Sequence, residues 1–326
     1  MIETKTIMKK ILLSALLAGA LTGCSKETPE QPAGNSREIR ISTAIDGVDA
    51  SKSVVLGSQT QAEVQVLRKD NTTSAPPTDF SGTPVSVTRE TTGNLTFATA
   101  PTYDLNNNYA FFAAYWPKGT PGSDKVTWTI DGATDIIATG AWNAGNYAAP
   151  VATGMTFSHQ LAQLEVVCTA DPTSTTSLDV VKAAWGKITN IELVNTSNTV
   201  DMAYDGLSMT FGAATQTLAL KQPDYDTAFA SFDLAKNNTA VNAAGMFAPG
   251  SDTATIKLKV TSEKVTGGKE IEVQLKQDNT TDKGFDKGLK HTVTLTFGAS
   301  TKDIAVTATT ITAWGTGYTG SGSLEN

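Results

Sequence analysis

The chain has 326 residues, a formal net charge of -7, 17% charged residues and 7% aromatic residues. The acidic balance is spread along the chain without a basic cluster, which excludes the electrostatic footprint of a nucleic-acid-binding protein. Thr, Ser, Ala, Gly and Asn are abundant, a composition that favours strands and turns over long helices and predicts an all-β fold with one large or two ordinary domains.

The first predicted element is an export signal. Two lysines precede an unbroken run of apolar or small residues from Ile11 to Leu21, which is too short to span a bilayer but fits the core of a signal peptide. The run ends in Leu21-Thr22-Gly23-Cys24, which resembles the bacterial lipobox. Residues 1–23 are therefore predicted to be removed, and Cys24 to carry acyl chains, such as palmitate, that anchor the protein to the outer membrane at the cell surface.

Residues 24–38 follow as a polar stretch rich in Pro and Gly. Because such a stretch cannot bury apolar area, it is predicted to be a tether between the lipid and the folded part. The first strand pattern comes next and places Ile39, Ile41 and Ile45 in one alternating phase. Folding is expected to begin with this strand.

Alternating apolar patterns recur along the rest of the chain. Each predicts a strand with one buried face, and many short strands separated by turns predict β-sandwiches. The patterns are Val64/Val66, Val85/Val87, Phe111/Ala113/Tyr115, Val126/Trp128/Ile130, Ile271/Val273/Leu275 and Val293/Leu295/Phe297. A polar stretch at residues 171–177 separates two strand-rich halves. It predicts an N-terminal β-sandwich at residues 39–172 and a C-terminal β-sandwich at residues 173–326.

One segment carries a short helical pattern. Between residues 177 and 187, Leu178, Val181 and Trp185 share one helical face. A helix and a loop are both compatible with this pattern.

Cys168 and the two histidines lie inside strand patterns. Cys168 follows Leu164 and Val166 with period two, which predicts a buried side chain. It is the only cysteine of the exported part besides Cys24, whose thiol is predicted to carry lipid, so an intrachain disulfide is excluded there. His159 and His291 are predicted to be structural, and His159 to form a hydrogen bond to a neighbouring loop.

Three stretches resemble the fimbrillin family, also called type V pilins. They are AFFAAYWPKG at residues 110–119, GMTFSHQLAQLEVV at 154–167, and GLKHTVTLTF with IAVTATTITAWGTG between 288 and 317. The resemblance implies two tandem transthyretin-like β-sandwich domains, export as a lipoprotein, and proteolytic removal of the first strand at a basic residue. It also implies polymerisation by donor-strand exchange with other pilin subunits into a fimbria that supports adhesion.

The resemblance assigns the leaving strand to the segment that contains Ile39, Ile41 and Ile45. Lys52 stands where relatives usually carry Arg, which makes it the first candidate for proteolytic processing, and Arg37 and Arg40 are the other two. The alternative is that no cleavage occurs and that Lys52 is an ordinary solvated loop residue. A donor strand that replaces the leaving strand would restore both the hydrogen-bond ladder and the core.

The candidate donor strand lies near the C-terminus. Ile304, Val306 and Ala308 alternate, whereas Ile311 and Trp314 fall out of phase with them. The phase break predicts a β-bulge or a strand that leaves its sheet. The alternative is a closing strand of the chain's own domain, with Trp314 in the core.

Residue patterns typical of catalysis are missing from the sequence. Two histidines about 130 residues apart, without a nucleophile elbow or a phosphate-binding glycine loop, predict neither a metal site nor a cofactor, and the chain is predicted not to be an enzyme. The segment from Asp104 to Asn108 carries oxygen ligands but lacks the spacing of a calcium loop, so it predicts Asx turns. A sandwich hydrolase would need paired carboxylates in one cleft, and no such pair can be placed.

Another function remains open. A surface lipoprotein that does not polymerise would use exposed loops to bind glycan or a host protein, with Trp142 and Tyr147 as an aromatic platform. Separately, Asp226-Thr227-Ala228 and Asp252-Thr253-Ala254 resemble a short O-glycosylation acceptor.

Overall fold

The computed structural model describes most of the chain from residue 37 onward. The described residues are 37–46, 61–171, 177–250, 255–274, 276–277, 281–282, 284–299 and 304–313. Three residues with predicted roles, Cys24, Lys52 and Trp314, lie outside these ranges. The described part consists of strands with one α-helix, so the predicted all-β fold is confirmed. The tandem transthyretin-like arrangement and the division at residues 172/173 stay predictions.

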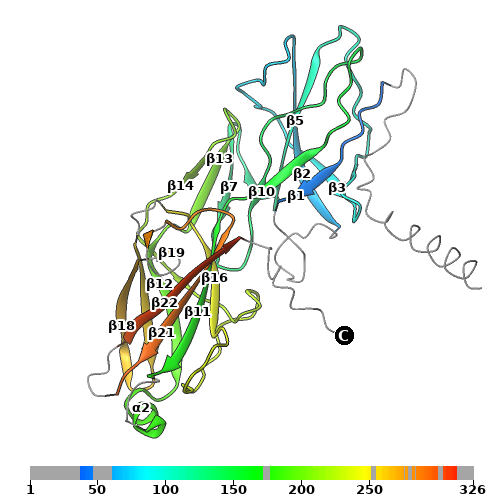
Figure 1. Ribbon diagram of the computed structural model, residues 1–326. Coiled ribbons are helices and arrows are strands. Elements are labelled where there is room, and N and C mark those ends of the chain that lie inside the picture. The colour runs from blue at the N-terminus through cyan, green and yellow to red at the C-terminus, as the bar shows by residue number, and fades with distance from the viewer. Residues whose placement is uncertain are drawn as a thin grey trace, which may run out of the picture.

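The upper body in Figure 1 is a single sheet wrapped around a core. Its strands, in spatial order, are β1 (Thr43–Ile45), β10 (Met155–His159), β8 (Ile137–Ala138), β5 (Tyr109–Trp116), β2 (Ala62–Asn71), β3 (Val85–Arg89) and β4 (Leu95–Thr96), with β9 (Trp142–Asn143) beside β5. The core holds side chains from most of these strands, including Val64, Val87, Phe112 and Phe157.

The lower body is a β-sandwich of two four-stranded sheets. One sheet has the order β16 (Ala243–Phe247), β11 (Ala162–Ala170), β21 (Leu289–Phe297) and β22 (Ile304–Ala313). The other has the order β15 (Gln216–Ala219), β12 (Ile188–Thr196), β17 (Thr255–Ser262) and β18 (Val265–Gln274). Strands β19 (Lys276–Gln277) and β20 (Thr281–Asp282) form a separate short pair.

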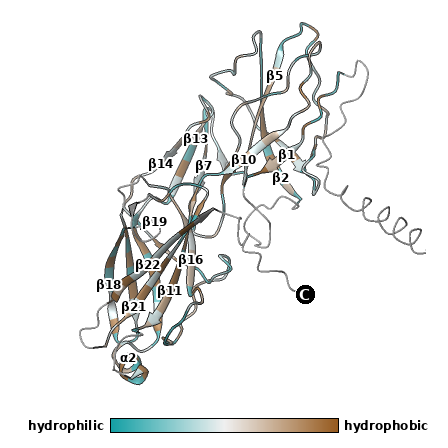
Figure 2. Ribbon diagram, in the orientation of Figure 1, coloured by the Kyte–Doolittle hydropathy of each residue, from teal (hydrophilic) through white to brown (hydrophobic). Residues whose placement is uncertain are grey.

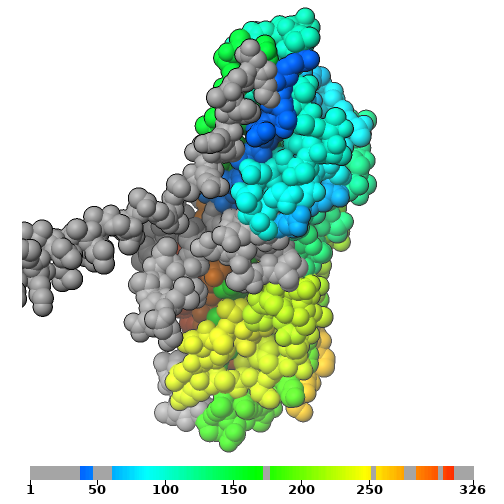
Figure 3. Space-filling view, turned by 90° about the vertical axis from the view of Figure 1, so that its right-hand side faces the viewer, coloured from blue at the N-terminus to red at the C-terminus, as the bar shows by residue number. Residues whose placement is uncertain are grey.

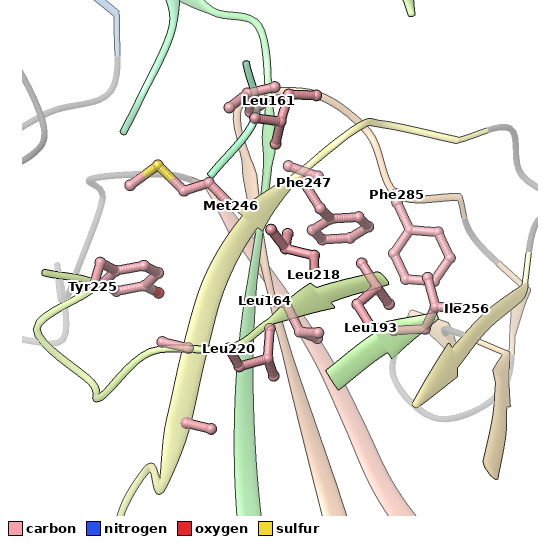
Figure 4. Packing of buried hydrophobic residues seen from close by; sticks show 14 of the residues in the cluster. Leu161, Leu164, Leu193, Leu218, Leu220, Tyr225, Met246, Phe247, Ile256 and Phe285 are labelled. Atoms are coloured by element: carbon pink, nitrogen blue, oxygen red, sulfur yellow. The ribbon is translucent and has the colours of Figure 1, made fainter. Parts of the chain in front are cut away.

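Apolar side chains from both sheets fill the space between them. Leu164 from β11 and Leu193 from β12 are fully buried, and the rings of Phe247 and Phe285 lie edge to face with centroids 5.4 Å apart (Figure 4). Along the strands, brown apolar bands alternate with paler or teal ones in Figure 2. This period-two alternation is the pattern that the sequence predicted for half-buried strands.

A third four-stranded sheet joins the two bodies. Its order is β6 (Thr120–Pro121), β7 (Lys125–Thr129), β13 (Thr199–Ala203) and β14 (Met209–Phe211). Phe80 N–H donates to the Tyr204 carbonyl at 2.9 Å, and the rings of Tyr115 and Trp128 lie edge to face at 5.4 Å. Strand β11 also pairs with β16 and β21, so hydrogen-bonded sheets connect residues on both sides of position 172.

The helical alternative for residues 177–187 is confirmed. Helix α2 (Leu178–Trp185) buries Val181 and Trp185 against the lower body. The indole N–H of Trp185 donates to the Gly298 carbonyl at 2.7 Å, and its ring lies edge to face with Phe297 at 5.1 Å. One large anchored side chain therefore holds this two-turn helix on the end of the sandwich.

Two predicted strand patterns need correction. Val85 is 53% exposed although its cross-strand partner Val66 is buried, and the buried side chains of β3 are Val87 and Arg89. Strand β5 is buried on both faces rather than on one, since the wrapped sheet covers one face and residues of the joining sheet cover the other. The prediction for Cys168 is confirmed: the side chain is 1% exposed, and burial raises the pKa of its thiol.

His291 is fully buried beside the ring of Phe285, with centroids 5.5 Å apart. Burial disfavours the charged imidazolium and lowers the pKa of His291 to about 4. The unfolded chain binds this proton at an ordinary pKa of about 6.5. The unfolded state therefore binds more protons than the folded state between these two values, and the folded state loses stability as the pH falls through that window.

We expect His291→Leu to remove this pH dependence. The unfolding free energy of the unmodified protein should fall by about 3 kcal/mol more than that of the variant between pH 7 and pH 4. Urea unfolding at a series of pH values measures the difference, and groups common to both proteins cancel. Parallel pH profiles would contradict the assignment to His291.

Candidate functional site: the strand that closes the N-terminal sheet

Residues 37–46 close the sheet of the upper body on itself. On one side, β1 runs parallel to β10, with Met155 N–H donating to the Ser42 carbonyl and Asp46 N–H donating to the Phe157 carbonyl, both at 2.9 Å. On the other side, the segment pairs with residues 93–103, the stretch that contains β4. The segment is therefore hydrogen-bonded to residues 93–103 along its length, and residues 42–46 are also hydrogen-bonded to β10. Its blue atoms reach the surface beside cyan and green neighbours in Figure 3.

The hydrogen bonds on the second side come at regular intervals. Thr43 N–H donates to the Gly93 carbonyl at 2.8 Å, and Leu95 N–H donates to the Ile41 carbonyl at 2.9 Å. Further back, Ile39 N–H donates to the Pro101 carbonyl at 2.8 Å and Tyr103 N–H donates to the Arg37 carbonyl at 2.7 Å. Removal of this segment would leave backbone groups unpaired on both walls of the resulting slot.

Inward side chains of the segment complete the core of the upper body. Ile39, Ile41 and Ile45 are 3%, 2% and 8% exposed and belong to the same buried cluster as Val64 and Phe157. The outward residues between them are exposed or half-buried. The predicted strand phase is thus the one that the structure adopts.

A polar side chain occupies the remaining inward position. Thr43 is 8% exposed, and its hydroxyl donates to the Gly93 carbonyl at 2.7 Å. The same oxygen accepts a hydrogen bond of 2.9 Å from Nε of Arg89, a guanidinium that is 1% exposed. Burial lowers the pKa of Arg89, yet a guanidinium stays protonated in proteins and always needs acceptors.

Two glycines let the backbone of the segment approach its neighbours closely. A Cβ on Gly154 would collide with the Ser42 carbonyl oxygen, and one on Gly93 would collide with the Thr43 carbonyl oxygen. Gly93 also has a φ of +87°, in the region that favours glycine. Neither position therefore has room for a side chain beside the backbone of Ser42 and Thr43.

Comparison of the sequence with models of known protein families gives a match. The model of the fimbrillin-like family matches residues 53–314, which is most of the chain. The chain belongs to the fimbrillin-like family. No curated protein matches the sequence of this fimbrillin-like chain.

Solved structures support the fold. A proposed cell adhesion protein from Bacteroides uniformis is 16% identical and gives a TM-score of 0.55, with 87% of this chain and 100% of that chain covered. A fimbrial protein from Bacteroides vulgatus is 13% identical with a TM-score of 0.45 over 84% and 99% of the two chains. A fimbrial assembly protein from Parabacteroides distasonis is 10% identical with a TM-score of 0.42 over 83% and 99%. Because the first structure is only 16% identical, its similarity supports the fold alone. The other two TM-scores are below 0.5 and support no conclusion.

The candidate processing residues occupy different environments. Arg37 is exposed, and its Nη2 donates to the Tyr103 carbonyl at 3.2 Å. The side chain of Arg40 is 58% exposed and lies 3.6 Å from a carboxylate oxygen of Glu38. Both arginines belong to the hydrogen-bonded segment, whereas Lys52 lies outside the described residues.

The candidate donor strand of the fimbrillin-like chain is paired within its own sandwich. Strand β22 forms an antiparallel ladder with β21 through Ala313 and has the edge position in its sheet. The register shifts between Val306 and Ala308. After this irregularity the buried phase moves to Thr309 and half-buried Ile311, while Ile304 and Val306 pack on the core before it. A bulge therefore lies at the predicted phase break, and the strand stays in its sheet.

The aromatic pair of the glycan-binding alternative does not form a flat exposed platform. Trp142 is half-buried, packs against the core of the upper body, and has its ring 6.2 Å from that of Phe112 at an angle of 38°. Tyr147 is 36% exposed. Only one of the two rings is therefore presented to solvent to a large extent.

The remaining polar candidates have structural partners. His159 Nδ1 lies 2.7 Å from a carboxylate oxygen of Asp135, and both side chains are buried. Asp135 precedes β8 in a loop, so the predicted hydrogen bond to a loop is confirmed. Asp104 accepts hydrogen bonds from Asn106 N–H and from Asn108, as the predicted Asx turns require. The hydroxyl of exposed Thr227 donates to Asp224 at 2.6 Å, and Thr253 lies outside the described part.

Metal-ligating side chains do not gather into groups of three or more anywhere in the described ranges. Within the same ranges, no helix has the length and apolar content needed to cross a membrane.

Sequence reasoning missed Arg89 as an inward residue of the slot. The signal was present, because Arg89 follows Val87 with period two and so shares its face. Arginine is normally placed outside because its burial is rare without partners, and the partner, Thr43, lies 46 residues earlier. In the sequence, Gly93 and Gly154 look like ordinary turn residues, and nothing there indicates their contact with the backbone of residues 42–43.

Proposed function

We propose that this fimbrillin-like chain is a structural subunit of a cell-surface pilus and supports adhesion. In this proposal, lipidation at Cys24 carries the subunit to the outer membrane, and proteolysis then releases residues 37–46. An extended segment of another pilin subunit takes their place. The observation that carries the proposal is the position of residues 37–46, which are paired with residues 93–103, are also paired with β10 at residues 42–46, and fill a core with three isoleucines.

An empty slot is less stable than one in which another strand replaces residues 37–46. Each buried isoleucine contributes about 1.5–3 kcal/mol of hydrophobic stabilisation, and the two walls carry backbone groups that need partners. A slot with unpaired edges and apolar pockets binds extended peptide segments by strand addition. Exchange of one strand for another of the same pattern therefore conserves most of the interactions, and cleavage makes the exchange irreversible.

Lys52 is the processing site that fits this scheme best. A protease needs an extended, unpaired backbone around the scissile bond, and the backbone of Arg37 and the residues on both sides of Arg40 are paired with residues 95–103. Cleavage after Arg40 would also leave residues 41–46 attached. Cleavage after Lys52 would separate the whole segment from the body, and it requires a protease that tolerates lysine.

The proposed partners are other copies of this chain or related pilin subunits. For the candidate donor, the cost depends on the residues used. Donation of Ile304, Val306, Ala308 and Ile311 would require the ladder between β21 and β22 to open, whereas Trp314 lies beyond the described end of that ladder. An adhesin at the pilus tip would keep β22 in place and accept a strand without donating one.

Limited digestion tests the proposal. The protein without its signal peptide and with Cys24→Ser is treated with a Lys/Arg-specific protease, then analysed by electrophoresis in detergent without boiling and by N-terminal sequencing. We expect detergent-resistant oligomers whose new N-terminus is Ser53. Lys52→Gln is the matched control and should stay monomeric, while Arg37→Gln and Arg40→Gln should still assemble.

A persistent monomer after complete cleavage at Lys52 would overturn self-assembly. It would instead favour a tip subunit or the lipoprotein that binds glycan or a host protein. New N-termini after Arg37 or Arg40 in the oligomers would move the processing site into the paired segment.

A further inference from the structure

We propose that Arg89 sets the register of the strand that occupies the slot, by requiring a hydroxyl side chain at its third inward position. The inference rests on the proposed function, because it concerns the choice and alignment of the incoming strand. Its partner is an extended segment with two apolar inward residues, then Thr or Ser, then a further apolar residue. The phase Ile304, Val306 and Ala308 of the candidate donor lacks the hydroxyl, so the inference favours a strand from a related pilin subunit.

The four inward positions of the resident strand are not equivalent. Ile39, Ile41 and Ile45 occupy the first, second and fourth positions, and each meets apolar neighbours. Thr43 occupies the third position, where its hydroxyl bridges Nε of Arg89 and the Gly93 carbonyl at 2.9 and 2.7 Å. Both polar needs of that hydroxyl, one donor and one acceptor, are met inside the sheet.

Apolar pockets alone cannot fix the register of such a strand. A slip by one residue turns every inward side chain outward and is strongly disfavoured. A slip by two residues keeps the same side chains pointing inward, and it moves an isoleucine side chain into the pocket of the neighbouring isoleucine. Discrimination against this slip must come from the inward position that is polar, which is the position of Thr43 beside Arg89.

A slipped strand would place isoleucine against the buried guanidinium. The Nε–H group of Arg89 would then lose the Thr43 hydroxyl as its acceptor, although Arg89 is only 1% exposed. A buried N–H group of a charged side chain is costly to leave without an acceptor. A single buried polar residue fixes the register of coiled coils by the same penalty. Gly93 and Gly154 lie close to the backbone of residues 42–43, which keeps the third inward position of the strand next to Arg89.

Peptide exchange tests the inference without changing the fold of the protein. Cys24→Ser protein cleaved at Lys52 is incubated with a fluorescent peptide of residues 37–46, and binding is followed by anisotropy. We expect the peptide with Thr43→Ser to bind like the original and the peptide with Thr43→Val to bind at least about tenfold more weakly. With Arg89→Met protein, the Thr and Val peptides should bind alike.

The register itself is read by photo-crosslinking. Ala44 pairs with Thr156 in the parallel ladder, and both side chains are exposed. A photoreactive group at position 44 of the peptide should therefore label Thr156 when Thr43 is present. With Thr43→Val, labelling should spread to Gly154 and Ser158, two residues away on either side.

The outcomes separate the inference from the proposed function. Equal binding and equal labelling by the Thr and Val peptides would overturn the role of Arg89 and leave strand exchange standing. Failure of every peptide to enter would overturn strand exchange. In that case the uncleaved protein still decides the role of Arg89: Thr43→Val should speed hydrogen exchange at residues 155–157 more than Thr43→Ser does, and Arg89→Met should abolish this difference.

Discussion

Ile41→Asp is expected to destabilise the upper body by about 4 kcal/mol, through the loss of a buried apolar side chain and the burial of a carboxylate without a partner. Ile41 is 2% exposed, and its carbonyl accepts a hydrogen bond from Leu95 N–H on one wall of the slot. Hydrogen exchange should accelerate in β4 and β10, which flank the segment. Urea unfolding, followed by tryptophan fluorescence, gives the change in free energy.

Arg40→Gln is the matched control for this prediction. The residue is the immediate neighbour of Ile41, but its side chain is 58% exposed and its ion pair with Glu38 is open to solvent. Surface pairs of this kind contribute about 0–1 kcal/mol, so the variant should unfold almost like the original protein. Equal effects at positions 40 and 41 would contradict the buried placement of the Ile41 side chain.

Trp185→Ala is expected to cost about 4 kcal/mol, because a fully buried indole leaves a large cavity under helix α2. Trp185 is 0% exposed and contacts the ring of Phe297 edge to face. Trp185→Phe should cost less, about 1–2 kcal/mol, since it keeps an aromatic ring but removes the hydrogen bond to the Gly298 carbonyl. Denaturant unfolding monitored by circular dichroism measures both values.

Val180→Ala is the control on the same helix. Its side chain is 50% exposed, and surface substitutions of this kind change stability by about 0.5 kcal/mol or less. A loss at Val180 similar to that at Trp185 would mean that α2 stabilises the sandwich through its whole surface rather than through one anchoring side chain.

Local patterns in the sequence predicted much of the fold. The alternation of Ile39, Ile41 and Ile45 predicted their burial, and Leu178, Val181 and Trp185 indicated a shared face for α2 while leaving helix and loop open. These patterns depend on periods of 2 and 3.6 residues, which a single segment carries by itself. The buried position of Cys168 was predictable for the same reason.

Long-range pairing could not be predicted in this way. Strand β11 pairs with β21, and β7 pairs with β13, but no residue of β11 or β7 indicates which partner it takes. The sequence likewise predicted the apolar inward positions of residues 39–45 but not the polar one, because Thr43 and Arg89 become informative only when they are seen together. The double burial of β5 also depends on a partner sheet from elsewhere in the chain.

The pairing of β11 with β21 has a consequence for the order of folding. Gln163 lies opposite Lys290 in this parallel ladder, so β11 cannot complete its pairing with β21 until almost the whole chain has been synthesised. Contacts this distant in sequence make folding slow, because a large loop must close before any of them forms. Until then the apolar strand is exposed to aggregation. We therefore expect the unfolded chain to need protection from aggregation until its last strands are available for pairing.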